Sequence, residues 1–440
     1  MIDEIFNALE YFNDTILWGY LGIGLILTSG LYLSFKARFA QFFKFHKVIR
    51  HFIHCAQGSK NHELHDEGIS PIRVFFASIG GCIGIGNITG IVLGVQIGGP
   101  GALVWVLTIA ILGSIIKYSE IYLGVKYRRR GKKSGFDGGP MYFLQKAFPT
   151  AKWVAGLMAV FLCIYGIEIY MFSVIKSSFV ANFNLNEWVV ILGFLALILV
   201  TVAGGVQRVG AISSYLIPFF VIIYLAMTLY ILAVNVDQIP SLIKLVLKSA
   251  FHGHAPLGGF AGSTALIALS KGFSSAAYSG DVGIGYASII NSETRFMDPK
   301  HQAIFAIFAI FLDTYVVCTC TILLVLMTGV WAQPIDSTLM VQEALGQYFP
   351  YMNYFMPVFL FILAFSTIAT YMMAGIKCAA FLAPKVGVKI YICYGIFAFL
   401  FFSFHETKYA FLVMNIAGGF LMLINIAGIL KLRNEIDYKI

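Results

Sequence analysis

Charged residues are scarce in this chain of 440 residues, because Asp, Glu, Lys and Arg together make up only 12% of it. Soluble domains carry about 25% of these residues, whereas here 59% of the chain is hydrophobic. One globular core cannot bury so much apolar surface, and the excess must face lipid. The sequence therefore excludes an ordinary soluble domain and predicts an integral membrane protein.

The chain also lacks the cysteine patterns of metal or disulfide proteins. Its seven cysteines are scattered, mostly in apolar segments, with no zinc spacing and no disulfide framework. The loop after the first apolar stretch holds five histidines, and we expect a solvated basic loop there, without a metal: His46, His51, His54, His62 and His65.

A net charge of +9 does not indicate a nucleic-acid partner here. The basic residues form short runs between apolar stretches, as in cytoplasmic loops beside anionic lipid. Runs such as Arg128-Arg129-Arg130 follow alternate stretches, whereas the connections 181–186 and 329–352 contain no Lys or Arg. The positive-inside rule then predicts a multi-pass protein of the plasma (inner) membrane, with its N-terminus outside and its C-terminus in the cytoplasm.

Long apolar stretches are abundant, and about 20 residues suffice to span a bilayer. We predict an all-α polytopic fold with eleven spans, near residues 16–36, 70–95, 101–125, 150–180, 187–205, 211–234, 262–290, 300–328, 353–376, 387–404 and 408–431.

Two of these spans are rich in glycine. The second contains Gly80-Gly81-Cys82-Ile83-Gly84-Ile85-Gly86-Asn87, and the seventh contains Ser279-Gly280-Asp281-Val282-Gly283-Ile284-Gly285. Glycine is a poor helix former, so both helices are expected to break there. The alternative is that these glycines only permit close helix packing.

The two glycine-rich spans hold matching positions, because each opens a unit of five spans with opposite topology. That arrangement indicates an inverted-repeat transporter. The units expected are a peripheral helix with a basic loop (1–69), a first repeat (70–234), an extracytoplasmic connector (235–261), a second repeat (262–431) and a cytoplasmic tail (432–440).

Four stretches together resemble the alanine or glycine:cation symporter family, and they cover nearly the whole chain in order. They include Gly84-Ile85-Gly86-Asn87-Ile88-Thr89-Gly90, Gly204-Gly205-Val206-Gln207-Arg208, Pro299-Lys300-His301-Gln302 with Asp313-Thr314, and Phe365-Ser366-Thr367-Ile368. The resemblance implies a leucine-transporter-like core after one peripheral helix. It also implies amino-acid uptake coupled to Na⁺ or, in some members, H⁺.

Four positions depart from the family pattern. Gly280-Asp281 stands where the family has Asn-Glu, Phe172 lies near a family Gln that contacts substrate, and Tyr371 replaces a Trp. These departures mark a divergent member whose substrate need not be alanine.

The chemistry of a zwitterion defines the candidate site. Backbone N–H groups at a half-helix start bind a carboxylate, while unwound carbonyls and hydroxyls bind Na⁺. The substrate-binding candidates are Ile83, Gly84, Gly86, Asn87, Phe172, Thr367 and Tyr371. The ion-coupling candidates are Ser366, Thr367, Asp281, Asp313 and Glu168, of which the carboxylates leave H⁺ open.

Other ionisable pairs have structural interpretations. Lys117 and Glu120 are three residues apart, an ordinary helix pair, and Asp281 has Lys271 as a possible partner.

The leading hypothesis is a secondary active transporter that imports a small neutral amino acid, alanine- or glycine-like, with Na⁺. It needs no cofactor and no metal beyond Na⁺. The alternatives are an H⁺-coupled or differently selective transporter, a channel, and a polytopic membrane enzyme. No nucleophile–base or metal set is recognisable, so an enzyme is not expected.

Overall fold

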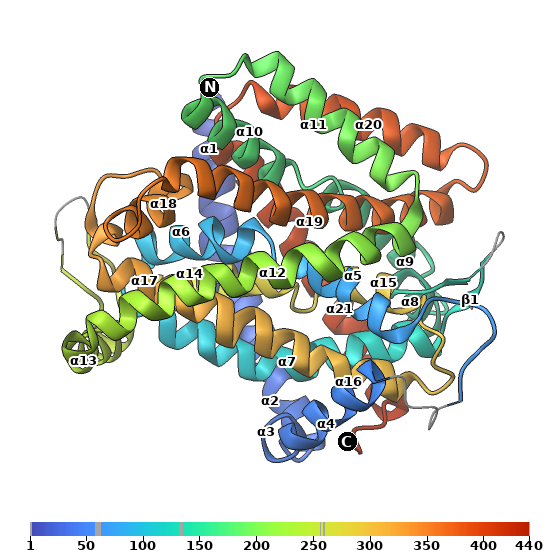
Figure 1. Cartoon of the computed structure of the whole chain (residues 1–440). Helices are drawn as coiled ribbons and strands as arrows, with labels where there is room; N and C mark the ends of the chain where they lie inside the picture. The colour runs from blue at the N-terminus through green and yellow to red at the C-terminus, as the bar shows by residue number, and fades with distance from the viewer. Residues whose placement is uncertain (1, 58–62, 132–134, 256, 258–259, 440) are drawn as a thin grey trace.

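The computed structural model describes residues 2–57, 63–131, 135–255, 257 and 260–439, apart from the side chains of 2, 3, 5 and 205–217. The described chain is nearly all helical, as the composition predicts (Figure 1). Its one two-stranded sheet pairs β1 (Arg129–Arg130) with β2 (Phe136–Asp137) antiparallel.

The first half of the chain holds α1 (Ile2–Tyr11), η1 (Phe12–Gly22), α2 (Ile23–Lys36), α3 (Ala40–Phe43), α4 (Phe45–Ala56), α5 (Pro71–Cys82), η2 (Ile85–Asn87), α6 (Thr89–Gly98), α7 (Ala102–Lys126), α8 (Pro140–Ala147), α9 (Trp153–Tyr165), α10 (Ile169–Phe183), α11 (Glu187–Val202) and α12 (Gly205–Val234). The second half holds η3 (Val236–Gln238), α13 (Ile239–His252), α14 (Ala265–Gly280), α15 (Tyr286–Asn291), α16 (Pro299–Ile310), η4 (Phe311–Cys318), α17 (Thr319–Met327), η5 (Val330–Ala332), α18 (Ser337–Gly346), α19 (Met352–Leu382), α20 (Gly387–Ser403), α21 (Thr407–Lys431) and η6 (Arg433–Glu435).

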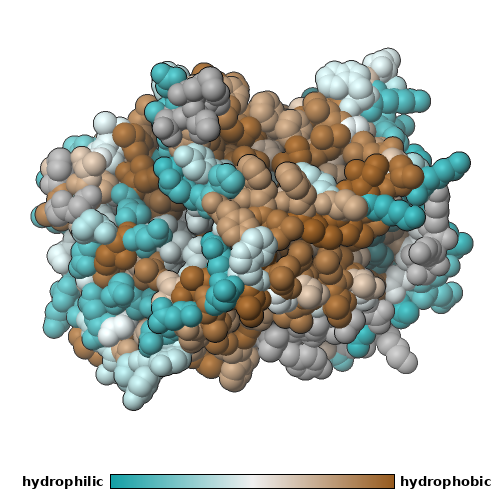
Figure 2. All heavy atoms as spheres, turned by 90° about the horizontal axis from the view of Figure 1, so that it is seen from above, coloured by the Kyte–Doolittle hydropathy of each residue, from teal (hydrophilic) through white to brown (hydrophobic). Residues whose placement is uncertain are grey.

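Length and composition support six membrane spans among the described residues, or up to eight if each of two bent helix pairs is one span. The bent pairs are α5 with 85–98, at 53°, and 218–234 with 236–252, at 73°. Figure 2 shows a broad hydrophobic area over the middle of one face, with hydrophilic patches toward both sides. The predicted total of eleven spans stays a prediction, since α11 and α20 are shorter apolar helices of 16 and 17 residues.

The two glycine-rich breaks lie where the sequence predicts them. Helix α5 ends at Cys82 and α6 begins at Thr89, with only the short 3₁₀ turn η2 between them. Helix α14 ends at Gly280 and α15 begins at Tyr286. We call residues 83–88 the first break and residues 281–285 the second break.

The fourth predicted span, expected to be continuous over 150–180, is also interrupted. Helix α9 ends at Tyr165 and α10 begins at Ile169, and Glu168 between them has φ +54°. A non-glycine residue in this left-handed conformation is strained and marks a site worth inspecting for function.

The helices pack around both breaks. Helix α7 lies against α14 and α16, and α5 lies against α12 and α19. Segments α1, η1 and α2 form one long helix, which we call the first helix. It lies beside α21, where Trp18 Nε1 donates a hydrogen bond to the carbonyl of Asn415 at 3.0 Å. Helices α11 and α20 lie side by side at one edge of the molecule (Figure 1).

The histidine-bearing segment forms α4 and the residues after it. His51 lies against His301, with ring centroids 5.3 Å apart, and His62 lies outside the described residues. Among the described residues, no group of three or more His, Cys, Asp or Glu side chains is placed to hold a metal ion.

Candidate functional site

The first break meets the end of α14, directly before the second break, in the interior, although about 190 residues separate the two segments along the chain. A Cβ atom built on Gly86 would lie 3.3 Å from both Ser279 Cα and Tyr278 Cε1. That spacing is tighter than ordinary van der Waals contact, so only glycine lets these segments meet as they do. The structure thus brings Gly86 and the end of α14 into one site.

Asn87 holds the first break in shape. Its Oδ1 accepts a hydrogen bond from Gly84 N at 2.9 Å. Its Nδ2 donates to Asp313 Oδ1 at 2.6 Å and to Cys318 Sγ at 3.2 Å. The amide is fully buried and all its bonds are internal, so in this conformation it supports the break and Asp313 instead of facing a ligand.

Asp313 lies in η4, a π-helical turn that interrupts the span formed by α16 and α17. Such turns are frequent at functional sites. The carboxylate is fixed at both oxygens, because Thr314 Oγ1 donates to Oδ2 at 2.8 Å while Asn87 occupies Oδ1. Sequence reasoning found Asp313 but gave no sign of the π-helix.

Oxygen atoms gather where α19 crosses the first break. Thr367 Oγ1 lies 3.1 Å from the carbonyl oxygen of Gly80 and 3.0 Å from that of Leu363. A Cβ on Gly84 would lie 2.5 Å from the same hydroxyl. The adjacent Ser366 is also buried. Hydroxyl and carbonyl oxygens in such a cluster are the ligands that Na⁺ takes in transporters with broken helices.

Lys117 connects the two breaks. Its Nζ donates to the carbonyl of Gly280 at 2.7 Å and lies 3.0 Å from Cys82 Sγ. Glu120 instead accepts from Ser288 N at 3.2 Å and Asn425 Nδ2 at 2.9 Å. The expected helix pair between Lys117 and Glu120 is therefore wrong, because each side chain points to a different neighbouring helix.

Asp281 begins the second break with φ +51°. Its Oδ2 accepts from Ala287 N at 3.0 Å, while its Oδ1 is buried without a hydrogen-bond partner among the described residues. Lys271, considered as its partner, pairs with Asp14 at 2.6 Å.

Glu168 faces the same region. Tyr278 Oη donates to its Oε2 at 3.0 Å, and both residues are buried. Phe172, one turn later, points elsewhere: its ring lies 4.4 Å from that of Phe399 on α20. Met171 points toward the first break instead, since its Cε would lie 3.4 Å from a Cβ on Gly84.

Buried tyrosines gather around Tyr371 of α19, near the breaks, and sequence reasoning missed all but Tyr371. Tyr371 stacks on Tyr286 with centroids 3.7 Å apart, and Tyr165 lies 5.6 Å from Tyr371 and 6.2 Å from Tyr278. The hydroxyls of Tyr165 and Tyr286 are buried without hydrogen-bond partners among the described residues. Tyrosines in mid-span, away from the interfaces where they usually gather, were the available signal.

Near the breaks, three buried polar atoms lack hydrogen-bond partners within the part of the chain that the structure describes: the Tyr165 and Tyr286 hydroxyls and Asp281 Oδ1. An unpaired buried polar group costs about 1–3 kcal/mol, so such groups are rare without a water, ion or ligand to bind. The arrangement is suited to a small polar ligand with hydrogen-bond donors and acceptors.

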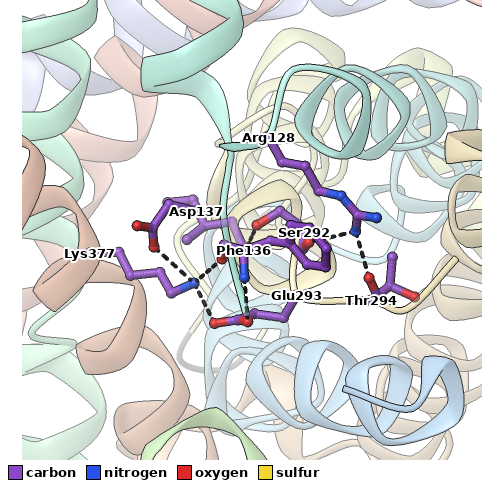
Figure 3. Close-up of polar contacts among 8 residues, drawn as sticks. Arg128, Phe136, Asp137, Ser292, Glu293, Thr294 and Lys377 are labelled. Atoms are coloured by element: carbon purple, nitrogen blue, oxygen red, sulfur yellow. Dashed lines mark hydrogen bonds and ion pairs between the residues drawn. The ribbon is translucent and has the colours of Figure 1, made fainter. Parts of the chain in front are cut away.

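A separate polar cluster lies beside the β1–β2 hairpin (Figure 3). Lys377 on α19 contacts Glu293, the carbonyl of Phe136 at 2.8 Å and Asp137 at 3.5 Å. These residues come from α19, from the hairpin after α7 and from the loop after α15. The cluster therefore ties α19 and the hairpin to the loop after α15.

Arg128 adds further contacts next to this cluster. Its guanidinium donates to the carbonyls of Ser292 at 2.9 Å and Thr294 at 2.6 Å, and lies 3.8 Å from the Phe136 ring centroid (Figure 3). Burial lowers the pKa of Arg128 to about 10, which still leaves it charged at neutral pH.

Comparisons with known proteins agree with this architecture. The model of the sodium:alanine symporter family matches residues 3–439. The chain is 29% identical to an uncharacterized transporter of Haemophilus influenzae over 99% of this chain and 94% of that one. It is 27% identical to the sodium/alanine symporter AgcS of Methanococcus maripaludis over 97% and 95%.

Among solved structures, MhsT in complex with L-phenylalanine superposes with a TM-score of 0.56 at 16% identity, covering 83% of this chain and 89% of that one. This likeness shows a leucine-transporter-like fold. With a family match over nearly the whole chain, the protein is a multi-pass secondary amino-acid transporter and not an enzyme. The chain belongs to the sodium:alanine symporter family.

Proposed function

We propose that the protein imports a small neutral amino acid together with Na⁺ by alternating access, with the substrate held between the first and second breaks. The observation that carries this proposal is the contact of two broken helices beside the Thr367–Gly80 oxygen cluster. The name of the archaeal relative, a sodium/alanine symporter, supports the same pair of cargoes.

Na⁺ binds at the Thr367 hydroxyl with the carbonyls of Gly80 and Leu363, and Ser366 lies next to this set. All these ligands are oxygens, which hard cations prefer. Such a site needs no titratable group. Na⁺ there would hold the end of α5 against α19, which couples ion occupancy to the shape of the first break.

The amino acid lies against Gly86 of the first break, with its ammonium facing Asp281 Oδ1 and the Tyr165 and Tyr286 hydroxyls around it. Gly84 and Gly86 both approach their neighbours closely, so an amino acid admitted beside them must be small. Ile83 and Tyr371 line the same space. Phe172 does not contact the substrate, because it packs on Phe399. Glu168, which accepts a hydrogen bond from Tyr278, lies on that side of the site instead. Asn87 supports the break.

The two five-helix units, 70–234 and 262–431, act as inverted repeats that rock around this site, with 1–69 as the peripheral segment, 235–261 as connector and 432–440 as tail. The Lys377–Glu293 cluster closes the cytoplasmic side. This orientation, in the plasma membrane with the N-terminus outside, follows from the positive-inside rule.

Uptake into proteoliposomes tests the proposal. The purified protein is supplied with each of the twenty amino acids, with an inward Na⁺ gradient, an inward H⁺ gradient, or neither. We expect Na⁺-driven accumulation of small neutral amino acids. Uptake that ignores Na⁺, or a preference for large or charged amino acids, contradicts it.

Thr367→Val supplies the residue-level test, because it keeps the shape of the side chain and removes the hydroxyl. Losing one ligand worth about 1–1.5 kcal/mol raises the Na⁺ concentration for half-maximal uptake about tenfold. Thr108→Val on α7 is the matched control, since that hydroxyl donates to the Val104 carbonyl of its own helix at 2.8 Å. Equal Na⁺ dependence in wild type and Thr367→Val refutes the Na⁺ site.

Coupling to H⁺ is the second candidate, because Glu168 is buried at the break between α9 and α10. If uptake follows the H⁺ gradient alone, Glu168→Gln and Asp281→Asn identify the carrier. The variant that removes the proton-carrying carboxylate should lose pH-driven uptake but retain exchange of substrate.

A further inference from the structure

A cavity lies apart from the breaks, between the first helix and the rest of the protein. Its volume is about 300 Å³. Asn13 and Asp14 on η1, Lys271 on α14 and Asn415 on α21 line it, together with Gln96 on α6 and the segment 335–338. None of these residues belongs to the substrate or ion site described above.

Charges of both signs face this cavity. Lys271 Nζ lies 2.6 Å from Asp14 Oδ2, and their side chains are only 17% and 32% exposed. Glu10 and Lys408 also line the wall. Such a wall complements a small molecule that carries one positive and one negative group.

Two buried acceptors in the same wall lack partners. Asn13 and Asn415 are 3% and 6% exposed, and the side-chain oxygen of each has no hydrogen-bond partner among the described residues. Asn13 Nδ2 donates to Asp14 Oδ1 at 3.0 Å, which orients the amide. Buried carbonyl oxygens of this kind call for an N–H donor.

The local backbone also departs from an ordinary helix. Residues Phe12–Gly22 are π-helical, and this widened turn begins at the cavity. π-helical turns are rare and concentrate at functional sites. A helix that only contacts lipid does not need such a π-helical stretch. The stretch therefore indicates that the first helix, which lies outside the five-plus-five core, takes part in function.

We propose that this cavity is a second binding site for an amino-acid zwitterion. The ammonium bonds to Asp14 and to the orphan oxygens of Asn13 and Asn415, and the carboxylate pairs with Lys271. A bound zwitterion replaces the Lys271–Asp14 pair with two charge-assisted contacts, so no charge is left uncompensated. The ligand class rests on the proposed function, but binding here is measured without transport.

One aromatic layer separates the cavity from the first break. Tyr170 lines the cavity, and its ring lies 4.8 Å from Phe411 and 6.2 Å from Tyr278. Tyr278 in turn contacts Gly86. Tyr170 and Phe411 thus stand between the cavity and the central site.

Equilibrium dialysis of the purified full-length protein tests this, with the transported amino acid as radiolabelled probe. We expect two molecules bound per chain in wild type and one in Gly86→Leu, whose central site is filled. Asp14→Asn/Lys271→Met in that background should weaken the remaining binding at least tenfold, whereas Lys244→Met on the exposed face of α13 should not.

The double variant leaves no unpaired charge, and Asn415→Leu gives an independent second variant with the same expected loss. One molecule per chain in wild type, with transport intact, overturns this inference alone. Unchanged binding in both cavity variants also overturns it. So does a result in which the cavity holds phosphatidylethanolamine and no amino acid. Failure of wild type to bind any of the twenty amino acids overturns the proposed function as well.

Discussion

Adding a single methyl group at Gly86 should uncouple the two breaks. Its Cβ would lie 3.3 Å from Ser279 Cα, a backbone atom, and from the Tyr278 ring. Those neighbours must move by a few tenths of an ångström, and overpacking of this kind costs about 1–3 kcal/mol. At 1.4 kcal/mol per factor of ten, the closed arrangement becomes about 5- to 150-fold less populated.

The assay is initial-rate uptake in proteoliposomes, normalised to folded protein by size-exclusion chromatography. We expect Gly86→Ala to lower the rate about tenfold, and Gly86→Leu to reach background. Gly90→Ala is the matched control, because its Cβ would meet Tyr278 at 3.7 Å, an ordinary contact. Alanine also favours helix over glycine by about 1 kcal/mol, so this control should fold at least as well as wild type.

The reasoning is refuted if Gly86→Leu folds and transports at the wild-type rate. It is also refuted if Gly90→Ala loses as much activity as Gly86→Ala, because the effect would then come from any added methyl in this segment.

Two further predictions concern the charged ends of the helices. Lys377→Met removes the ammonium that pairs with the carboxylates of its cluster, which destabilises the closed arrangement by about 1–3 kcal/mol. A thiol reagent should then reach buried Cys82 more often, and labelling in detergent should become about ten times faster. Lys389→Met, at an exposed position near the start of α20, should leave the labelling rate unchanged, and equal rates in both variants would disprove the closure. The hydrogen bond from Tyr127 lowers the pKa of Glu435 below its usual 4.5. A depressed pKa means that the stabilisation is present above about pH 4.5 and is lost as the pH falls below it. Tyr127→Phe should therefore reduce the melting temperature at pH 7 but not at pH 3, and an equal loss at both values would count against this bond.

Much of the fold followed from local sequence features. Scarce charge and long apolar stretches predicted a helical membrane protein, and glycine clusters placed the breaks at 83–88 and 281–285. These features act locally, since a glycine weakens its own helix wherever that helix packs. The third interruption, at Gly166 to Glu168, escaped prediction because one glycine beside an acid does not distinguish a break from a tolerated kink.

Side-chain partners could not be predicted in the same way. Asn87 and Asp313 are 226 residues apart and bond at 2.6 Å, while Lys117 and Glu120, three apart, point to different helices. Phe172 lies on the right helix but faces α20. Sequence spacing fixes which residues share a helix face, but not which neighbour that face meets.

The sequence by itself determined that this protein is a helical membrane transporter with two interrupted spans, because hydropathy and glycine content act segment by segment. Only the tertiary structure decided what the interruptions contact. It joined Gly86 to Ser279 and Thr367 to Gly80, placed buried tyrosines near them, and formed a charged cavity beside the first helix. Such contacts depend on how distant helices pack together, and no short stretch of sequence encodes that packing.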